Sequence, residues 1–162
     1  MTTDLAKSIR IVPATEKDVP LLLTLICEFS EHVKLRHHVV ATEELLRRSL
    51  FGEDRRGAEA LIGYAGNQPV GFAVFFHNFS TFLGKPGLYI EDIYVRPEVR
   101  GKGYGKAMFG HLLNLARTRR CGRMEWSCLD WNERAIAFYK KMGAVAQDDS
   151  TTYRIALHPE ES

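Results

Sequence analysis

Hydrophobic residues recur along the chain with two periods, one helical and one extended. Over residues 21–29 apolar side chains return every three or four positions, and Thr15 with Asp18 forms a variant capping box ahead of them. This pattern predicts an amphipathic helix. Asn132 and Gly143 have the chemistry of an N-cap and of a residue just after a C-cap, and they bracket a later helix. In all, further helices are predicted at about residues 42–50, 104–118 and 133–142.

Runs of β-branched and aromatic residues between these helices indicate strands. Residues 66–69 carry a turn signal, and residues 79–87 are expected to form a loop. Consecutive strands before Val95 imply antiparallel pairing, whereas the strand–helix–strand unit over residues 88–129 implies one parallel pair. The sequence therefore predicts an α/β fold with a mixed sheet. The expected strands cover about residues 9–12, 60–64, 70–76, 88–95, 123–129 and 153–157.

Composition narrows the class of protein. A length of 162 residues suits a single domain over residues 1–162, and 45% hydrophobic residues are enough for a core. A net charge of +2 argues against a dedicated nucleic-acid binder. We expect no membrane partner, because there is no long apolar run and no signal-peptide pattern. Three cysteines without a C-x-x-C motif fit reduced thiols in the cytoplasm, and six histidines without ligand spacing predict no metal.

A glycine-rich turn joins a predicted strand to a predicted helix. Residues 95–106 read V-R-P-E-V-R-G-K-G-Y-G-K. Glycines let backbone N–H groups approach an anion, and a helix N-terminus adds partial positive charge, so the expected ligand is a phosphate or pyrophosphate. A P-loop does not fit, because its first glycine would fall on Arg100 and its Ser or Thr on Ala107. A G-x-G-x-x-G fingerprint does not fit either, since its last glycine would fall on Lys106 or Met108.

What fits this turn is R-x-x-G-x-G, with Arg100, Gly103 and Gly105. Here the chain resembles the GNAT superfamily of acyl-CoA-dependent N-acetyltransferases, in which such a turn holds the pyrophosphate of coenzyme A. A second signature of that family, N-x-x-A-x-x-F-Y-x-x-x-G followed by F or A, is matched from Asn132 to Ala144. Both signatures look most like those of the spermidine/spermine (diamine) N-acetyltransferase branch. The resemblance extends over about residues 11–155.

The resemblance implies the GNAT acyl-CoA N-acyltransferase fold. In that fold a mixed, mostly antiparallel sheet is flanked by helices, and a parallel strand pair splays apart to admit the pantetheine arm. The resemblance also implies acetyl-CoA as cosubstrate, a small-molecule amine as acceptor and, commonly, a homodimer. Acetyl transfer to an amine requires an amine without its extra proton, donors for the developing oxyanion and a proton for the leaving thiolate.

Two residues are candidates for proton transfer. Tyr139 is the candidate acid, because a phenol with a pKa of about 10 can protonate a thiolate and because the resemblance places the family's general acid there. Glu91 is the candidate base, acting through water, at the position where the polyamine branch carries a base or an amine-binding glutamate. A carboxylate that only attracts the cationic substrate is the alternative. Since side chains alternate along a strand, Glu91 and Asp92 are expected to point to opposite faces.

Further residues are expected to bind the two substrates. Backbone N–H groups near Ile93 and Tyr94 are expected to stabilise the oxyanion. The residues expected to contact acetyl-CoA are Ile93, Tyr94, Val95, Arg100, Gly101, Lys102, Gly103, Tyr104, Gly105, Lys106, Asn132, Ala135 and Tyr139. Those expected near the amine are Glu91, Asp92, Glu31, His32, Phe82 and Trp126.

The chain departs from the polyamine enzymes on the acceptor side. Their aromatic–glutamate pair after the first helix falls on His32 and Val33, and the acidic residue expected before the last strand falls near Thr151. Phe82 does match an aromatic residue of their loop. The acceptor class therefore stays open among polyamines, diamines and thialysine-like amines. Two other hypotheses are acetylation of a protein N-terminus or lysine, and a CoA-binding module with little catalysis.

Overall fold

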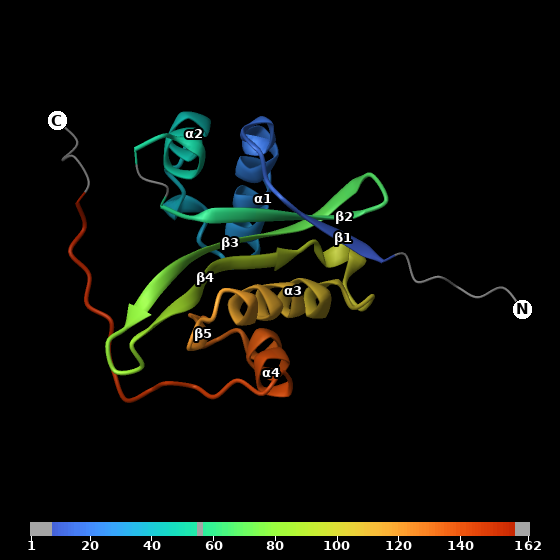
Figure 1. Ribbon diagram of the computed structural model, residues 1–162. Helices are drawn as coiled ribbons and strands as arrows, with labels where there is room; N and C mark the ends of the chain where they lie inside the picture. The colour runs from blue at the N-terminus through green and yellow to red at the C-terminus, as the bar shows by residue number, and fades with distance from the viewer. Residues whose placement is uncertain (1–7, 55–56, 158–162) are drawn as a thin grey trace, which may run out of the picture. The chain divides into compact units, whose positions relative to one another are not determined.

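The computed structural model describes residues 8–54 and 57–157 (Figure 1). The chain groups into two compact units, one ending at Ser127 and the other beginning at Cys128. The first unit contains the sheet and most of the helices, and the second contains a single α-helix within its described residues.

The first unit is built on a mixed sheet whose five strands lie side by side in chain order. Neighbours among the first four strands pair antiparallel, and the fifth pairs parallel to the fourth, with Gly87 opposite Arg123 and Ile90 opposite Trp126. The prediction of a mixed sheet with one parallel pair is confirmed. The strands are β1 (Ile9–Pro13), β2 (Glu59–Ala65), β3 (Gln68–Ser80), β4 (Lys85–Val95) and β5 (Arg123–Trp126).

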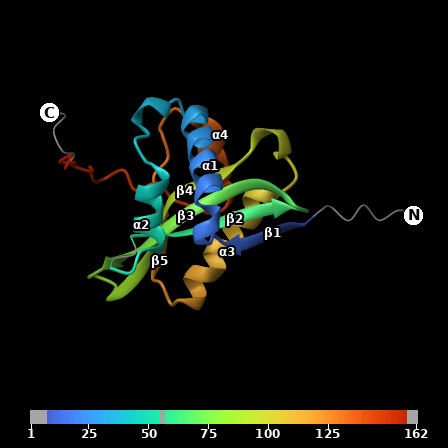
Figure 2. The ribbon, with the colours of Figure 1, turned by 90° about the horizontal axis from the view of Figure 1, so that it is seen from above.

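Helices cover both faces of this sheet. α1 (Val19–His32) and α2 (Glu43–Phe51) lie on one face, and α3 (Tyr104–Thr118) lies on the other, as Figures 1 and 2 show. The helical periodicity of the sequence is explained by these contacts, because each apolar stripe faces the sheet. The buried core on the α1 face contains Leu22, Leu25, Leu50, Ala60, Ile62, Phe72 and Tyr94.

Local capping sets where the helices begin. The capping box is confirmed, since the Asp18 carboxylate accepts hydrogen bonds from the backbone N–H and the hydroxyl of Thr15. This box opens the short 3-10 helix η1 (Glu16–Asp18), which runs directly into α1. Thr42 caps α2 by accepting a hydrogen bond from the Leu45 N–H at 3.2 Å. Two further 3-10 helices are η2 (Arg36–His38) and η3 (Pro97–Val99).

The loop predicted over residues 79–87 is wrong. β3 continues to Ser80 and β4 already begins at Lys85, so only residues 81–84 form the turn. Ladder pairs extend to Phe79 opposite Pro86 and to Ser80 opposite Lys85. The glycines and proline here suggested a loop, but pairing between two long neighbouring strands overrides that weak local preference.

The sequence also overestimated the strands near the C-terminus. β5 ends at Trp126 instead of reaching residue 129, because its pairing with β4 stops at Ile90. The strand predicted at residues 153–157 does not form, since those residues are exposed and pair with no strand in the described chain. A strand needs a partner backbone, which an apolar pattern alone does not supply.

The second unit contains α4 (Glu133–Lys141). Asn132 caps its start, accepting a hydrogen bond from the Ala135 N–H at 3.2 Å, and Gly143 follows its C-cap with a φ of 90°. Both predicted caps are confirmed. Across the described residues, none of the helices has the length and apolar character needed to cross a membrane.

Candidate active site

A β-bulge interrupts β4 at Glu91, the candidate base. Asp92 lies opposite Val74, whereas Ile90 lies opposite Phe75, so Glu91 is an extra residue in the ladder. Bulges of this kind re-aim side chains and often occur next to active sites. Strict alternation along the strand is therefore broken at Glu91, and the expectation that Glu91 and Asp92 point to opposite faces loses its basis.

Asp92 faces the side of the sheet that α1 covers. Its partner Val74 packs against the core on that face, as does Tyr94, two residues further along β4. Burial raises the pKa of Asp92 to about 6, and the nearby Glu91 carboxylate adds to the increase. A carboxyl group with a pKa close to neutrality can take up and release a proton under ordinary conditions. Glu91 itself is exposed.

The edge of β4 that faces away from β3 is unpaired beyond the bulge. The parallel ladder ends at Ile90 and Trp126, and within the described part of the first unit no strand continues it along residues 91–95. Backbone groups on that edge are available to a ligand. The Tyr94 side chain is only 6% exposed in the core, and its carbonyl oxygen points toward Gly71 of β3. Because backbone groups alternate along a strand, the groups that face the free edge are those of Ile93 and Val95.

The turn after β4 has the geometry of an anion-binding site. Gly101 and Gly103 have φ values of 81° and 80°, a conformation that other residues adopt only with strain. A side-chain Cβ at Gly101, Gly103 or Gly105 would meet no atom within 4 Å, so space around the turn is open. Gly103 is the N-cap of α3, and no side chain of the described residues caps that helix end. The first N–H groups of α3 therefore remain available to an anion.

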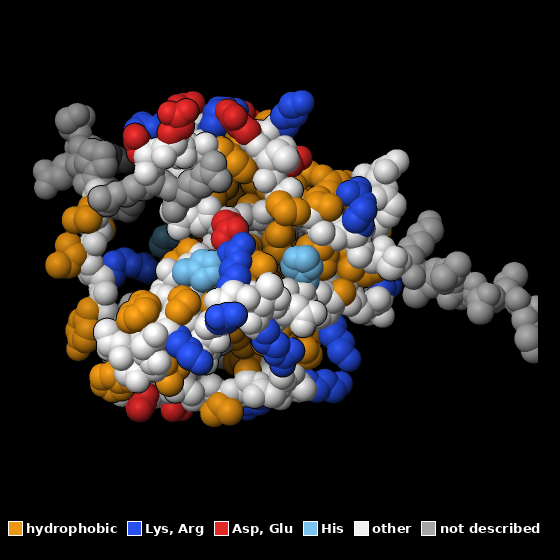
Figure 3. Space-filling model, viewed as in Figure 1, with side chains coloured by type: hydrophobic (Ala, Val, Ile, Leu, Met, Phe, Trp, Pro, Cys, Tyr) orange, Lys and Arg blue, Asp and Glu red, His pale blue; other side chains and the backbone are white. Residues whose placement is uncertain are grey.

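Cationic side chains surround this turn. The Nε of Arg100 donates to the Val95 carbonyl at 3.1 Å, and its Nη2 lies 3.2 Å from Nε2 of His32. Lys102 and Lys106 are exposed. Figure 3 shows Lys and Arg side chains spread along the region of α3, so the charge close to the turn is that of Arg100, Lys102 and Lys106. These three cations fit a phosphate-bearing ligand, because cations and helix N–H groups act on the same anion.

Tyr104 contributes differently from the other turn residues. Its side chain is buried under the first turn of α3, with 6% of it exposed. It therefore anchors the helix start and can contact a ligand only through its backbone.

Besides Glu91 and Asp92, the four other residues expected near the amine lie in three places. Glu31 and His32 end α1, where Glu31 lies 3.9 Å from Arg36 and the His32 ring packs against Tyr94. Phe82 is fully exposed at the tip of the β3–β4 hairpin. Trp126 packs edge-on against Phe109 of α3, with ring centroids 5.2 Å apart. The structure thus brings His32 to the glycine turn and places Trp126 on the α3 face, away from the face of Asp92.

Two polar contacts in the first unit had no signal in the sequence. The Tyr89 hydroxyl and the Ser127 hydroxyl lie 2.8 Å apart, which ties β4 to the end of β5. Arg96 forms a two-point ion pair with Glu28 of α1. Each pair joins residues 38 or 68 positions apart, so only the fold reveals them.

In the second unit Tyr139 lies on α4. Burial raises the pKa of its hydroxyl to about 12, and Cys128 adds to the increase. The phenol therefore stays protonated at any ordinary pH. Its ring makes an edge contact with Phe138 at 5.5 Å. Asn132 uses its side-chain oxygen as the cap of this helix.

A separate cavity of about 250 Å³ lies elsewhere in the first unit. It is bounded by apolar residues of α2, β2 and α3, together with Arg119, which is paired with Glu59. It includes none of the residues that the sequence assigned to chemistry. No group of three or more potential metal-ligating side chains occurs among the described residues.

Comparisons with known proteins identify the family of this chain. Residues 23–144 match the model of the acetyltransferase (GNAT) family. The chain is 35% identical to the thialysine N-epsilon-acetyltransferase of Caenorhabditis elegans over 139 residues, which cover 86% of this chain and 84% of the relative. It is 31% identical over 135 residues to the human spermidine/spermine N(1)-acetyltransferase-like protein 1, covering 79% of this chain and 19% of that protein.

Solved structures show the same fold. An integron cassette protein from the mobile metagenome of V. cholerae superposes with a TM-score of 0.76 at 25% identity, covering 92% of this chain and 93% of that one. The family match spans three quarters of the chain, including the bulged strand, the glycine turn and α4. The chain therefore belongs to the GNAT family of acetyltransferases.

Proposed function

We propose that the protein transfers the acetyl group of acetyl-CoA to a primary amine of a small molecule, by direct attack of the amine in a ternary complex. The observation that carries this proposal is the open glycine turn at the uncapped start of α3, directly after the bulged strand β4. The relatives named for thialysine and for spermidine/spermine acetylation support a small amine as acceptor.

The turn would hold the diphosphate of the cosubstrate. Residues 101–106 supply backbone N–H groups, and Arg100, Lys102 and Lys106 supply positive charge. The backbone N–H groups of Ile93 and Val95 face the unpaired edge of β4, where they would stabilise the thioester oxygen as negative charge develops. Acetyl-CoA supplies the activated acyl group, and the chain supplies its orientation.

Tyr139 is the proposed general acid. Its hydroxyl is protonated at working pH, because its pKa is raised to about 12. It can donate a hydrogen bond or a proton to the departing sulfur. Asn132 and Ala135, in the first turn of the same helix, are proposed contacts of the cosubstrate.

Glu91 is the proposed base, acting through water, with Asp92 beside it. The amine must lose a proton before it attacks, since an alkyl ammonium has a pKa of about 10.4. Two neighbouring carboxyl groups attract that cation, and the raised pKa of Asp92 allows it to share the proton. Glu31, His32, Phe82 and Trp126 are proposed to contribute to the acceptor side.

We further propose that the two units form one catalytic domain that acts as a homodimer in the cytoplasm. The family match runs through the boundary at Ser127, which supports one domain. Exposed Phe79, Phe82 and Leu83 on the β3–β4 hairpin offer apolar surface for a second subunit. In the described chain the three cysteines form no disulfide, which fits a reducing compartment.

The test is acetyl-CoA turnover, followed by thiol release, with spermidine, spermine, putrescine, thialysine, lysine and a peptide amine. Turnover of one small amine that falls sharply in Tyr139→Phe supports the proposal. Turnover with the peptide alone would replace it by protein acetylation. Tight CoA binding without turnover of any amine would favour a CoA-binding module. Light scattering of the same preparation measures the mass and tests the dimer.

A further inference from the structure

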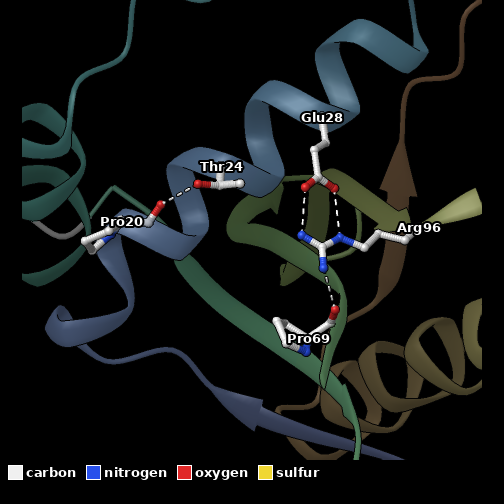
Figure 4. A network of polar contacts seen from close by, with 5 residues as sticks. All are labelled: Pro20, Thr24, Glu28, Pro69 and Arg96. Atoms are coloured by element: carbon white, nitrogen blue, oxygen red, sulfur yellow. Dashed lines mark hydrogen bonds and ion pairs between the residues drawn. The ribbon is translucent and has the colours of Figure 1, made fainter. Parts of the chain in front are cut away.

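Arg96 is the first residue after β4 and is held from three sides (Figure 4). Its Nε and Nη2 donate to the two carboxylate oxygens of Glu28 at 2.9 and 2.7 Å. Its Nη1 donates to the Pro69 carbonyl at 2.9 Å, and its backbone N–H donates to the Val70 carbonyl at 2.8 Å. Arg96 thus ties together α1, the start of β3 and the end of β4.

This ion pair is stronger than an ordinary surface pair. The Arg96 and Glu28 side chains are 20% and 32% exposed, so solvent screens them only in part. Two parallel hydrogen bonds fix the relative orientation of the two groups. Thr24, one turn earlier on α1, directs its hydroxyl to the Pro20 carbonyl at 3.1 Å, as Figure 4 also shows. The two hydrogen bonds to Glu28 hold the Arg96 side chain in place, and its backbone N–H is bonded to β3, so the chain is fixed at this residue.

A second contact repeats the pattern one helical turn further along. Glu28 and His32 are four positions apart and so lie on the same face of α1. Their partners Arg96 and Arg100 are also four positions apart and bracket η3. Helix α1 therefore holds the segment between β4 and the glycine turn at both of its ends.

We propose that the Glu28–Arg96 pair is a positioning element for the phosphate-binding turn, acting from α1 without touching the ligand. This inference rests on the proposed function, in which the turn binds the diphosphate of acetyl-CoA. A turn that is already ordered pays less conformational entropy when the ligand binds. Releasing Arg96 would let residues 96–103 sample other conformations, and affinity for the diphosphate would fall.

The experiment compares two acyl donors. Acetyl-CoA carries the diphosphate, whereas S-acetylpantetheine has the same thioester and arm without it. In Glu28→Gln we expect kcat/KM with acetyl-CoA to fall by about 5- to 20-fold, because KM rises while kcat stays nearly constant. With S-acetylpantetheine we expect kcat/KM to change by less than about twofold. Arg96→Lys keeps the charge but loses the two-point geometry, so it should show the same difference between the two donors. It replaces Glu28→Gln in the experiment if that variant does not fold.

A double-mutant cycle tests whether the two residues act as one unit. The variant with both Glu28→Gln and Arg96→Lys should be no worse with acetyl-CoA than the more affected of its two single variants. The matched control is Glu59→Gln, which breaks another two-point pair, with Arg119, at the far end of α3. Glu59→Gln should lower the stability of the protein without changing the ratio of kcat/KM with acetyl-CoA to kcat/KM with S-acetylpantetheine.

Each outcome is decisive for one of the two proposals. An equal fall of kcat/KM with both donors would show a general structural role and overturn the positioning inference. So would a double variant whose fall in kcat/KM equals the product of the two single effects. A wild-type protein that uses acetyl-CoA no better than S-acetylpantetheine would instead refute the diphosphate site, and with it the proposed function of the turn.

Discussion

Asp92 lies directly opposite Val74 in the antiparallel ladder, one residue beyond the point where β4 gains an extra position. This pairing turns the Asp92 carboxyl toward the face that α1 covers and takes it partly out of water. Its neighbour Glu91 stays exposed. Burial and the nearby Glu91 carboxylate together raise the pKa of Asp92 to about 6, and this shift can be tested directly.

Replacing Asp92 by Asn should stabilise the protein at high pH. Folding raises the pKa of Asp92 from its ordinary value of 3.8 to about 6, so the folded state holds this proton more tightly. The stability that this group contributes is full below pH 3.8 and is lost as the pH rises through about 6. After a discount for partial exposure, we expect the Tm of Asp92→Asn to exceed that of wild type by about 2–4 °C at pH 8. Thermal unfolding at pH 4 should show no such gain, and an equal gain at both pH values would contradict the prediction.

Tyr139→Phe should lower kcat by about 100-fold, because the leaving thiolate loses its proton donor. CoA affinity should stay within about twofold of wild type, as measured by titration calorimetry. Since the pKa of Tyr139 is raised to about 12, the wild-type kcat should not decline on the alkaline side up to about pH 10. Tyr153→Phe, at a tyrosine that is 90% exposed in the same unit, is the control and should leave kcat unchanged. A kcat of Tyr139→Phe within a factor of three of wild type would exclude the acid role.

Gly103→Ala should weaken CoA binding more than its cost in stability explains. Gly103 has a φ of 80°, which costs an alanine roughly 1–2 kcal/mol, and a methyl group there would project into the space proposed for the diphosphate. Gly66→Ala provides a matched control, because Gly66 has a φ of 61° and equally open surroundings in the β2–β3 turn. Both variants should lose similar stability in urea, whereas only Gly103→Ala should raise the Kd for CoA, by about tenfold or more. Equal CoA affinities would speak against the anion site.

Gly71→Ala should be among the most damaging small substitutions in the sheet. A Cβ at this position would overlap the backbone carbonyl of Tyr94 on the neighbouring strand, and backbone atoms cannot rotate away. We expect a loss of about 2–3 kcal/mol in the free energy of unfolding, measured in urea. At Gly63 the nearest atom is the end of the flexible Ile9 side chain, so Gly63→Ala should cost clearly less. A reversed order of the two variants would show that β3 and β4 can separate at Gly71.

Local signals predicted much of this protein correctly. The helix at residues 104–118 and the caps at Asn132 and Thr15 follow from short-range chemistry, so nearby residues were enough to find them. The errors came where distant backbones decide the outcome. Gly87 was expected in a loop but pairs with Asn78 in the β3–β4 ladder. Residues 153–157 were expected to form a strand but pair with no strand in the described chain.

The sequence by itself determined the family signatures, the order of helices and most strands, and the residue types that the chemistry needs, because these depend on spacing along the chain. Only the tertiary structure decided the orientation, burial and pKa values of those residues. The bulge at Glu91 depends on the register between β3 and β4, and the raised pKa of Asp92 depends on burial against α1. The Glu28–Arg96 pair joins residues 68 positions apart. Register, burial and long-range pairing arise only when separate segments pack together, and this is why they lie beyond the reach of sequence pattern.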